Sequence, residues 1–170
     1  MYKLKRLKKG EEKRALDFIE EAKLYLKECG VNQWQNGYPN LSTIEKDVEL
    51  SRGYFIEKDE EEIGYVCIDF LGEPGYENII GKWKSNGNYS VIHRMTIKSK
   101  FRDNGIAYKV FSMLETLTLE KGVGTIKVDT DISNKKMQHI ISKYGFEYCG
   151  TVISEDGGER LAYEKILKKI

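Results

Sequence analysis

The chain has 170 residues, of which 40% are hydrophobic and 32% charged, with a formal net charge of +1. Its length suits one domain over residues 1–170, and its composition is that of an ordinary globular protein. The balanced charge gives no global field that would attract nucleic acid, and no apolar run approaches the length that spans a membrane. The three cysteines are far apart, which argues against a disulfide framework or a zinc site and predicts a reducing, cytoplasmic location.

The first fifty residues carry helical periodicity. A short strand is predicted at residues 2–8, and apolar residues at helical spacing predict an amphipathic helix over 10–28. A link rich in turn-forming residues follows at 31–40. The sequence Ser42-Thr43-Ile44-Glu45 has the character of a capping box, so a second short helix is predicted to run to about Leu50.

From residue 53 the apolar pattern changes to a period of two, which is typical of strands. The predicted strands cover residues 53–58, 62–70, 76–83, 89–98 and 159–167, of which 76–83 is irregular. An amphipathic helix is predicted at 108–121, and residues 126–150 read as a strand, a short helix and another strand. Together these elements predict an α/β (α+β) domain with a mixed, mostly antiparallel central sheet flanked by helices.

The junction between the strand at 89–98 and the helix at 108–121 carries the strongest chemical signal. Residues 102–107 read Arg-Asp-Asn-Gly-Ile-Ala, a turn that opens directly into a helix. The first N–H groups of a helix have no internal acceptor and lie at the positive end of its dipole, so such a turn suits a phosphate or pyrophosphate. Taken alone, the turn is more typical of a helix start at which Gly105 and Ala107 merely allow close packing.

Two blocks together resemble the GNAT superfamily of acyl-CoA-dependent N-acetyltransferases. The turn is similar to its pyrophosphate loop, Arg/Gln-x-x-Gly-x-Gly/Ala. Residues 126–150 resemble its pattern of a strand, Asn-x-x-Ala/Met, a short helix, Gly-Phe and a strand, with Asn134 and Gly145-Phe146 at the expected spacing. The resemblance extends over nearly the whole chain, is least specific over Met1 to Leu50, and implies a single GNAT-like domain.

The resemblance implies acetyl-CoA as co-substrate and a set of residues that bind it. In this family the loop amides hold the pyrophosphate, the preceding strand offers its backbone to the pantetheine arm, the motif asparagine reaches the pantetheine side, and the short helix lines the thioester's channel. The residues of this chain at those positions are Arg102, Asp103, Asn104, Gly105, Ile106 and Ala107 for the loop, Met95, Thr96 and Ile97 for the strand, Asn134 for the asparagine, and Met137 and Ile141 for the channel.

The implied reaction is direct transfer of an acetyl group to a primary amine of a small molecule or peptide. It needs a neutral amine, a donor for the oxyanion and a proton source for the departing thiolate. Many relatives supply that proton from a tyrosine seven residues after the motif asparagine, a position that is Ile141 here. The acid therefore stays open between Tyr144, water and release of an unprotonated thiolate.

His93 is the candidate base, because it lies in the strand before the loop and an unperturbed imidazole titrates near ~6.5. The equal alternative is a histidine that fills a sheet face with one hydrogen bond. His139 is interpreted as structural. Near the C-terminus, Arg160 and Tyr163 are placed where they could reach the acceptor site.

In the superfamily the region after the first helix covers the acceptor site, which makes Gln33, Trp34 and Tyr38 candidate substrate-binding residues. The alternative is that the two aromatic residues pin the loop to the core, and Trp83 is likewise either a packing residue or a pocket wall. A homodimer is compatible with the family, whereas no metal, nucleic-acid or membrane partner is expected. The rival function is a non-catalytic acyl-CoA sensor, which the Ile141 departure favours.

Overall fold

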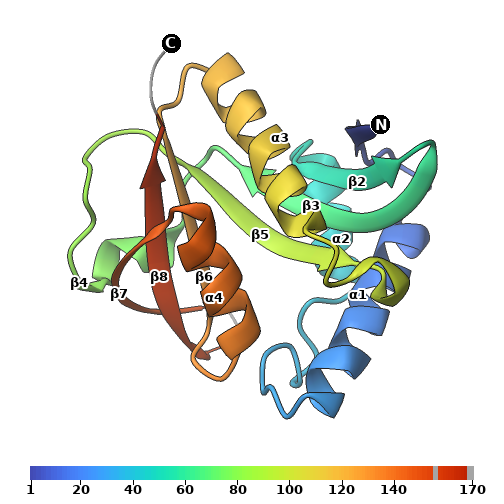
Figure 1. Cartoon of the computed structure of the whole chain (residues 1–170), viewed down its shortest axis with the longest axis horizontal. Helices are drawn as coiled ribbons and strands as arrows, with labels where there is room; N and C mark the ends of the chain where they lie inside the picture. The colour runs from blue at the N-terminus through green and yellow to red at the C-terminus, as the bar shows by residue number, and fades with distance from the viewer. Residues whose placement is uncertain (155–156, 168–170) are drawn as a thin grey trace.

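The computed structural model describes residues 1–154 and 157–167. Its elements, in chain order, are β1 (Tyr2–Arg6), α1 (Glu12–Glu28), α2 (Leu41–Glu49), β2 (Gly53–Lys58), β3 (Glu61–Asp69), the 3₁₀ turn η1 (Pro74–Asn78), β4 (Ile80–Gly81), β5 (Ser90–Ile97), the 3₁₀ turn η2 (Ser99–Phe101), α3 (Ile106–Glu120), β6 (Thr125–Asp131), α4 (Lys135–Tyr144), β7 (Glu147–Ile153) and β8 (Glu159–Ile166). Figure 1 shows their course. None of these helices is long and apolar enough to cross a bilayer.

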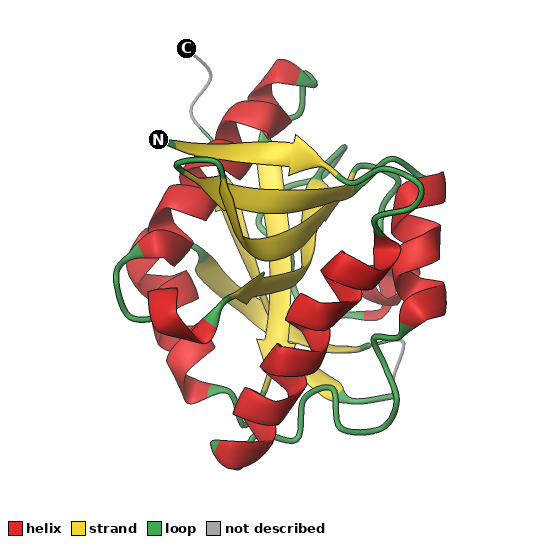
Figure 2. Cartoon of the chain, turned by 90° about the vertical axis from the view of Figure 1, so that its right-hand side faces the viewer, coloured by secondary structure: helices red, strands yellow, loops and turns green. Residues whose placement is uncertain are grey.

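One eight-stranded sheet runs through the molecule in the order β1-β2-β3-β5-β6-β8-β7-β4. Every neighbouring pair is antiparallel except β5 and β6, which α3 connects as a parallel crossover. The predicted α/β domain with a mixed, mostly antiparallel sheet is therefore confirmed. Figure 2 shows helices on both faces of the sheet.

The parallel pair is short, and this shortness makes room for a site. β5 and β6 are paired only from Ser90–Ile126 to Ile92–Val128. Beyond Ile92, β5 continues along β3 on its other side, and β6 continues along β8. The two strands therefore separate in the middle of the sheet, and their facing backbone edges no longer bond to each other.

Apolar side chains on each face decide where the helices pack. α3 and α4 bury a cluster against the sheet that includes Val110, Phe111, Leu114 and Ile141, whereas α1 and α2 bury Ala15, Ile19 and Ile44 against Phe55 and Tyr65 on the other face. Burial of such side chains is the main favourable contribution to this arrangement. The strand separation is thus overlaid by α1 on one face and by α4 on the other.

Two local predictions were wrong. The predicted strand at 76–83 is instead η1 followed by the two-residue strand β4, because Pro74 starts a 3₁₀ turn and only Ile80 and Gly81 pair with β7. The capping box of α2 lies two residues earlier than expected, since Asn40 is the N-cap and exchanges hydrogen bonds with Thr43. Elsewhere the predicted helices and strands are confirmed within a few residues.

Candidate active site

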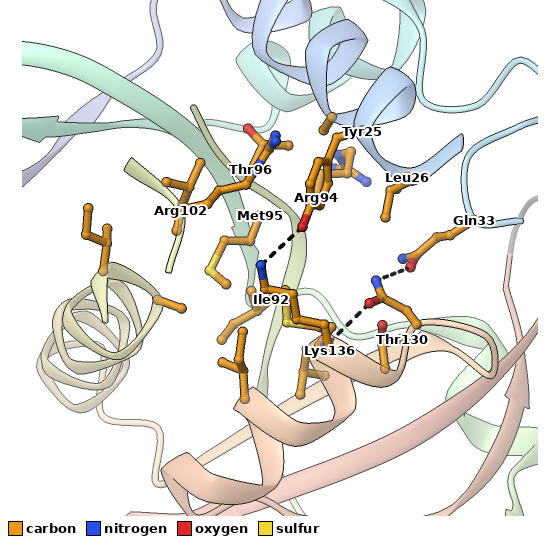
Figure 3. Close-up of a pocket in the computed structure, with 18 of the residues that line it drawn as sticks. Tyr25, Leu26, Gln33, Ile92, Arg94, Met95, Thr96, Arg102, Thr130 and Lys136 are labelled. Carbon is orange, nitrogen blue, oxygen red and sulfur yellow. Dashed lines mark hydrogen bonds between the residues drawn. The ribbon is translucent and has the colours of Figure 1, made fainter. Parts of the chain in front are cut away.

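A cleft of about 660 Å³ lies at the separation of β5 and β6, between α1 and the N-terminal turns of α3 and α4 (Figure 3). Ten predicted cofactor-binding residues line it, namely Met95, Thr96, Ile97, Arg102, Asp103, Gly105, Ile106, Ala107, Asn134 and Met137. Two others do not. Asn104 is exposed and its Nδ2 donates to the carbonyl of Phe101 at 3.4 Å, while Ile141 is fully buried in the core under α4.

The turn that enters α3 offers main-chain donors to the cleft. Gly105 is the N-cap residue with φ +70°, a left-handed conformation that glycine adopts without strain, and Asp103 adopts a similar φ of +67°. No side chain caps this helix, so the N–H groups of its first turn are not satisfied from within the helix. This arrangement is compatible with a pyrophosphate site, which stays a prediction of the sequence.

Two cations flank the ring of Tyr25 at this end of the cleft. The guanidinium carbon of Arg102 is 3.9 Å from the ring centroid, and Lys136 Nζ donates to the Tyr25 hydroxyl at 3.1 Å. Each cation also faces a carboxylate, Glu21 at 3.7 Å from Arg102 and Asp103 at 2.5 Å from Lys136. The hydrogen bond to Asp103 raises the pKa of Lys136. Sequence reasoning missed Tyr25 and Lys136, and the only available signal was the place of the lysine in the second sequence block.

A second, polar hollow of about 70 Å³ lies between the α1–α2 loop, η1 and the hairpin of β7 and β8. Six residues line both cavities, namely Gln33, Trp34, Ile92, His93, Arg94 and Asp129. The two cavities therefore meet where β5 and β6 separate. A ligand in the cleft and a second molecule in the hollow would touch at this junction.

The predicted acceptor residues all line the hollow, and Gln33 and Trp34 also line the cleft. Gln33 Oε1 accepts from Asn134 Nδ2 at 3.0 Å, which ties the α1–α2 loop to the start of α4. Tyr38 lines the hollow, and its hydroxyl accepts from Arg94 at 2.8 Å. Trp34 is 7% exposed and belongs to the core cluster under α1 while also lining both cavities. Trp34 therefore both packs in the core and forms part of the wall of the two cavities.

Other residues near the hollow have mixed placements. Arg160 lines it, whereas Tyr163 packs into the core formed with α3 and α4. Trp83 lines neither cavity and donates from Nε1 to the carbonyl of Tyr76 at 2.9 Å, so it is a packing residue. Tyr76 in turn donates to Asp129 at 2.5 Å. Sequence reasoning did not find Asp129, because nothing in the local pattern marks it.

His93 lines both cavities, with its side chain 16% exposed. Burial, together with the positive charges of Arg94 and Arg52, holds the pKa of His93 well below its usual range. The carboxylate of Glu73 lies 3.7 Å from Nε2, which is too far for a hydrogen bond and does not reverse this effect. His93 is therefore a neutral imidazole near pH 7.

Tyr144 has no place in the cleft. Its ring stacks on Tyr108 and packs against Phe111 and Phe146 on the α3 side of α4. Burial and the nearby Glu115 raise its pKa, which also makes it a weaker acid. His139, interpreted as structural, is exposed at the rim of the cleft.

A buried ionic network fixes β5 beside the junction. Asp47 is fully buried and accepts from Arg94 at 2.5 and 3.1 Å, from Arg52 at 2.8 Å and from the hydroxyl of Tyr65 at 2.5 Å. Arg94 has φ +52°, unusual for a residue with a Cβ, and lies at a register shift between β3 and β5. The network thus holds the strand in a bulge beside the cleft.

Comparison with known proteins gives the family. The model of the acetyltransferase (GNAT) family matches residues 18–146, while no curated protein matches the chain. A GNAT acetyltransferase from Streptococcus agalactiae is 31% identical with a TM-score of 0.86, covering 99% of this chain and 96% of its own. One from Listeria monocytogenes is 20% identical with a TM-score of 0.77, covering 98% and 95%.

A structure of the aminoglycoside acetyltransferase AAC(6')-Ib with coenzyme A and kanamycin is also similar in fold, at 18% identity and a TM-score of 0.71 over 98% of this chain and 95% of that one. The family match covers most of the chain, including the turn at residues 102–107 and the second sequence block as far as Phe146. The chain belongs to the acetyltransferase (GNAT) family.

Proposed function

We propose that the protein transfers the acetyl group of acetyl-CoA to a primary amine of a small molecule or peptide. The observation that carries this proposal is the junction of the two cavities at His93. A long cofactor in the cleft and an amine in the hollow would approach one point from different sides. The fold shared with an aminoglycoside acetyltransferase that binds coenzyme A and kanamycin supports the same assignment.

The residues of the cleft fit coenzyme A in two parts. The first-turn amides of α3, with Arg102 and Lys136, would hold phosphate groups by charge-assisted hydrogen bonds. The apolar wall and the unpaired edge of β5 at residues 95–97 would hold the pantetheine arm. When bound, acetyl-CoA supplies an acetyl group activated as a thioester.

His93 would act on the acceptor amine. An amine attacks only as the neutral species that has lost its ammonium proton to water, and the attack leaves an extra proton on its nitrogen. A neutral imidazole at the junction can take that proton as the new C–N bond forms. The lowered pKa of His93 keeps it unprotonated at neutral pH, although it also makes it a weaker base. A main-chain N–H of β5 would stabilise the oxyanion of the tetrahedral intermediate.

The test is thiol release from acetyl-CoA in the presence of a panel of small aliphatic amines, an aminoglycoside and a peptide with a free N-terminus. We expect turnover on at least one small amine. The variant His93→Gln should lower kcat on that amine while leaving the Kd for acetyl-CoA, measured by calorimetry, within about twofold. Unchanged kcat would remove His93 from the mechanism.

The second candidate is a non-catalytic sensor of acyl-CoA. It is favoured by the burial of Ile141, at the family's tyrosine position, and by the placement of Tyr144 outside the cleft. Binding of acetyl-CoA without thiol release on any amine in the panel would support the sensor. Failure to bind acetyl-CoA at millimolar concentration would exclude both functions.

A further inference from the structure

Two threonine hydroxyls in the wall of the cleft have no hydrogen-bond partner among the residues that the structure describes. Thr130 is 1% exposed and Thr96 is 4% exposed, and Oγ1 of each is unsatisfied. A buried hydroxyl without a partner has lost its hydrogen bonds to water and gained nothing in return. Because both residues line the cleft, a ligand there is the available partner.

Thr130 occupies the more informative position of the two. It lies on β6 two residues beyond Val128, the last residue paired with β5. Its neighbour Asp129 lines both cavities, so Thr130 is next to their junction and not at the phosphate-binding turn. Figure 3 shows Thr130 on the same side of the pocket as Gln33, which also lines both cavities.

The register of the sheet gives the face on which Thr130 lies. Thr130 is opposite Leu161 and Val128 is opposite Tyr163, and residues directly opposite in antiparallel strands share a face. Val128, Leu161 and Tyr163 all pack in the cluster formed with α3 and α4. Thr130 therefore lies on the face of the sheet that α3 and α4 cover, and it lines the cleft there.

We propose that Thr130 Oγ1 donates a hydrogen bond to a carbonyl oxygen at the acyl end of the acyl-pantetheine chain and so holds the thioester at the junction. This inference rests on the proposed function. The carbonyl groups at that end of the ligand are neutral acceptors, and a hydroxyl satisfies them without placing a charge in an apolar cleft. No covalent step involves Thr130. Its role is to position the acyl group.

The test is the variant Thr130→Val, which keeps the shape of the side chain and removes only the hydroxyl. We expect about tenfold weaker binding of acetyl-CoA by calorimetry, the usual effect of losing one hydrogen bond. Binding of adenosine 3',5'-bisphosphate, which lacks the pantetheine arm, should be unchanged. The melting temperature should be equal or higher because no protein partner is lost. Thr130→Ser should retain most of the affinity.

Thr118→Val is the matched control. Thr118 is fully buried on α3 outside the cleft, and its hydroxyl is 2.9 Å from that of Ser90. This variant should lower the melting temperature and leave acetyl-CoA binding unchanged. Wild-type affinity in Thr130→Val, or a lower melting temperature there, would overturn the inference while the proposed function stands. If the wild-type protein itself binds no acetyl-CoA, the proposed function fails first.

Discussion

The neutral state of His93 makes the stability of this protein depend on pH in a predictable direction. In the folded chain the pKa of His93 lies well below 6.5, because the side chain is buried and faces Arg94 and Arg52. In the unfolded chain it returns to about 6.5. Between these values the unfolded state binds one more proton than the native state, so acid favours unfolding.

The expected magnitude follows from linkage. Below the unfolded pKa, the contribution of His93 to the free energy of unfolding falls by up to about 1.4 kcal/mol per pH unit, and above it the contribution is constant. Integrated from pH 7.5 to 5.5, the loss is about 1.4 kcal/mol, provided that the folded pKa is well below 5.5. Other titrating groups add their own pH dependence. A comparison with a variant that lacks the imidazole isolates the contribution of His93.

The assay is urea denaturation of the wild-type protein and of His93→Gln at pH 7.5, 6.5 and 5.5. The wild-type protein should lose up to about 1.4 kcal/mol more than the variant over this interval, with most of the difference appearing below pH 6.5. Equal losses in the two proteins would mean that His93 is protonated as readily in the folded chain as in the unfolded one. The assignment of His93 as a neutral base would then be refuted.

Three further predictions concern the network, the turn and the cleft entrance. Asp47→Asn should lower the free energy of unfolding, measured by urea denaturation, by about 3–5 kcal/mol, because it leaves buried Arg94 without its carboxylate. A decrease below about 1 kcal/mol would contradict this. Gly105→Ala should lower the free energy of unfolding by about 1 kcal/mol through the positive φ alone, since an added Cβ meets nothing nearer than Tyr108 at 3.9 Å. Gly105→Glu should abolish acetyl-CoA binding in calorimetry, because it would place a carboxylate beside the phosphates. Lys136→Met should weaken that binding about fivefold, and Lys143→Met, a charge removed from the exposed face of the same helix, should not; equal effects would indicate only a general loss of positive charge.

Features set by neighbouring residues could be predicted from the sequence. The turn at 102–107 and the helix after it are local, because the unsatisfied N–H groups and the left-handed glycine lie within a few residues of each other. The same is true of Asn134, whose side chain caps α4 by accepting from the amide of Met137 at 3.1 Å. These signals were enough to predict the family and the turn that lines one end of the cleft. The error at residues 76–83 has a different cause, since whether a short segment pairs as a strand depends on its partner.

The junction of the two cavities was decided only by the tertiary structure. Arg94 and Asp47 are 47 residues apart in the chain, and Gln33 and Asn134 are 101 residues apart. No local pattern records such contacts. The low pKa of His93 and the missing partner of Thr130 both result from burial and from what surrounds each group in space. Local backbone chemistry therefore determined the turn at which we propose that the phosphates bind, whereas desolvation and long-range packing decided which side chains meet at the junction of the two cavities.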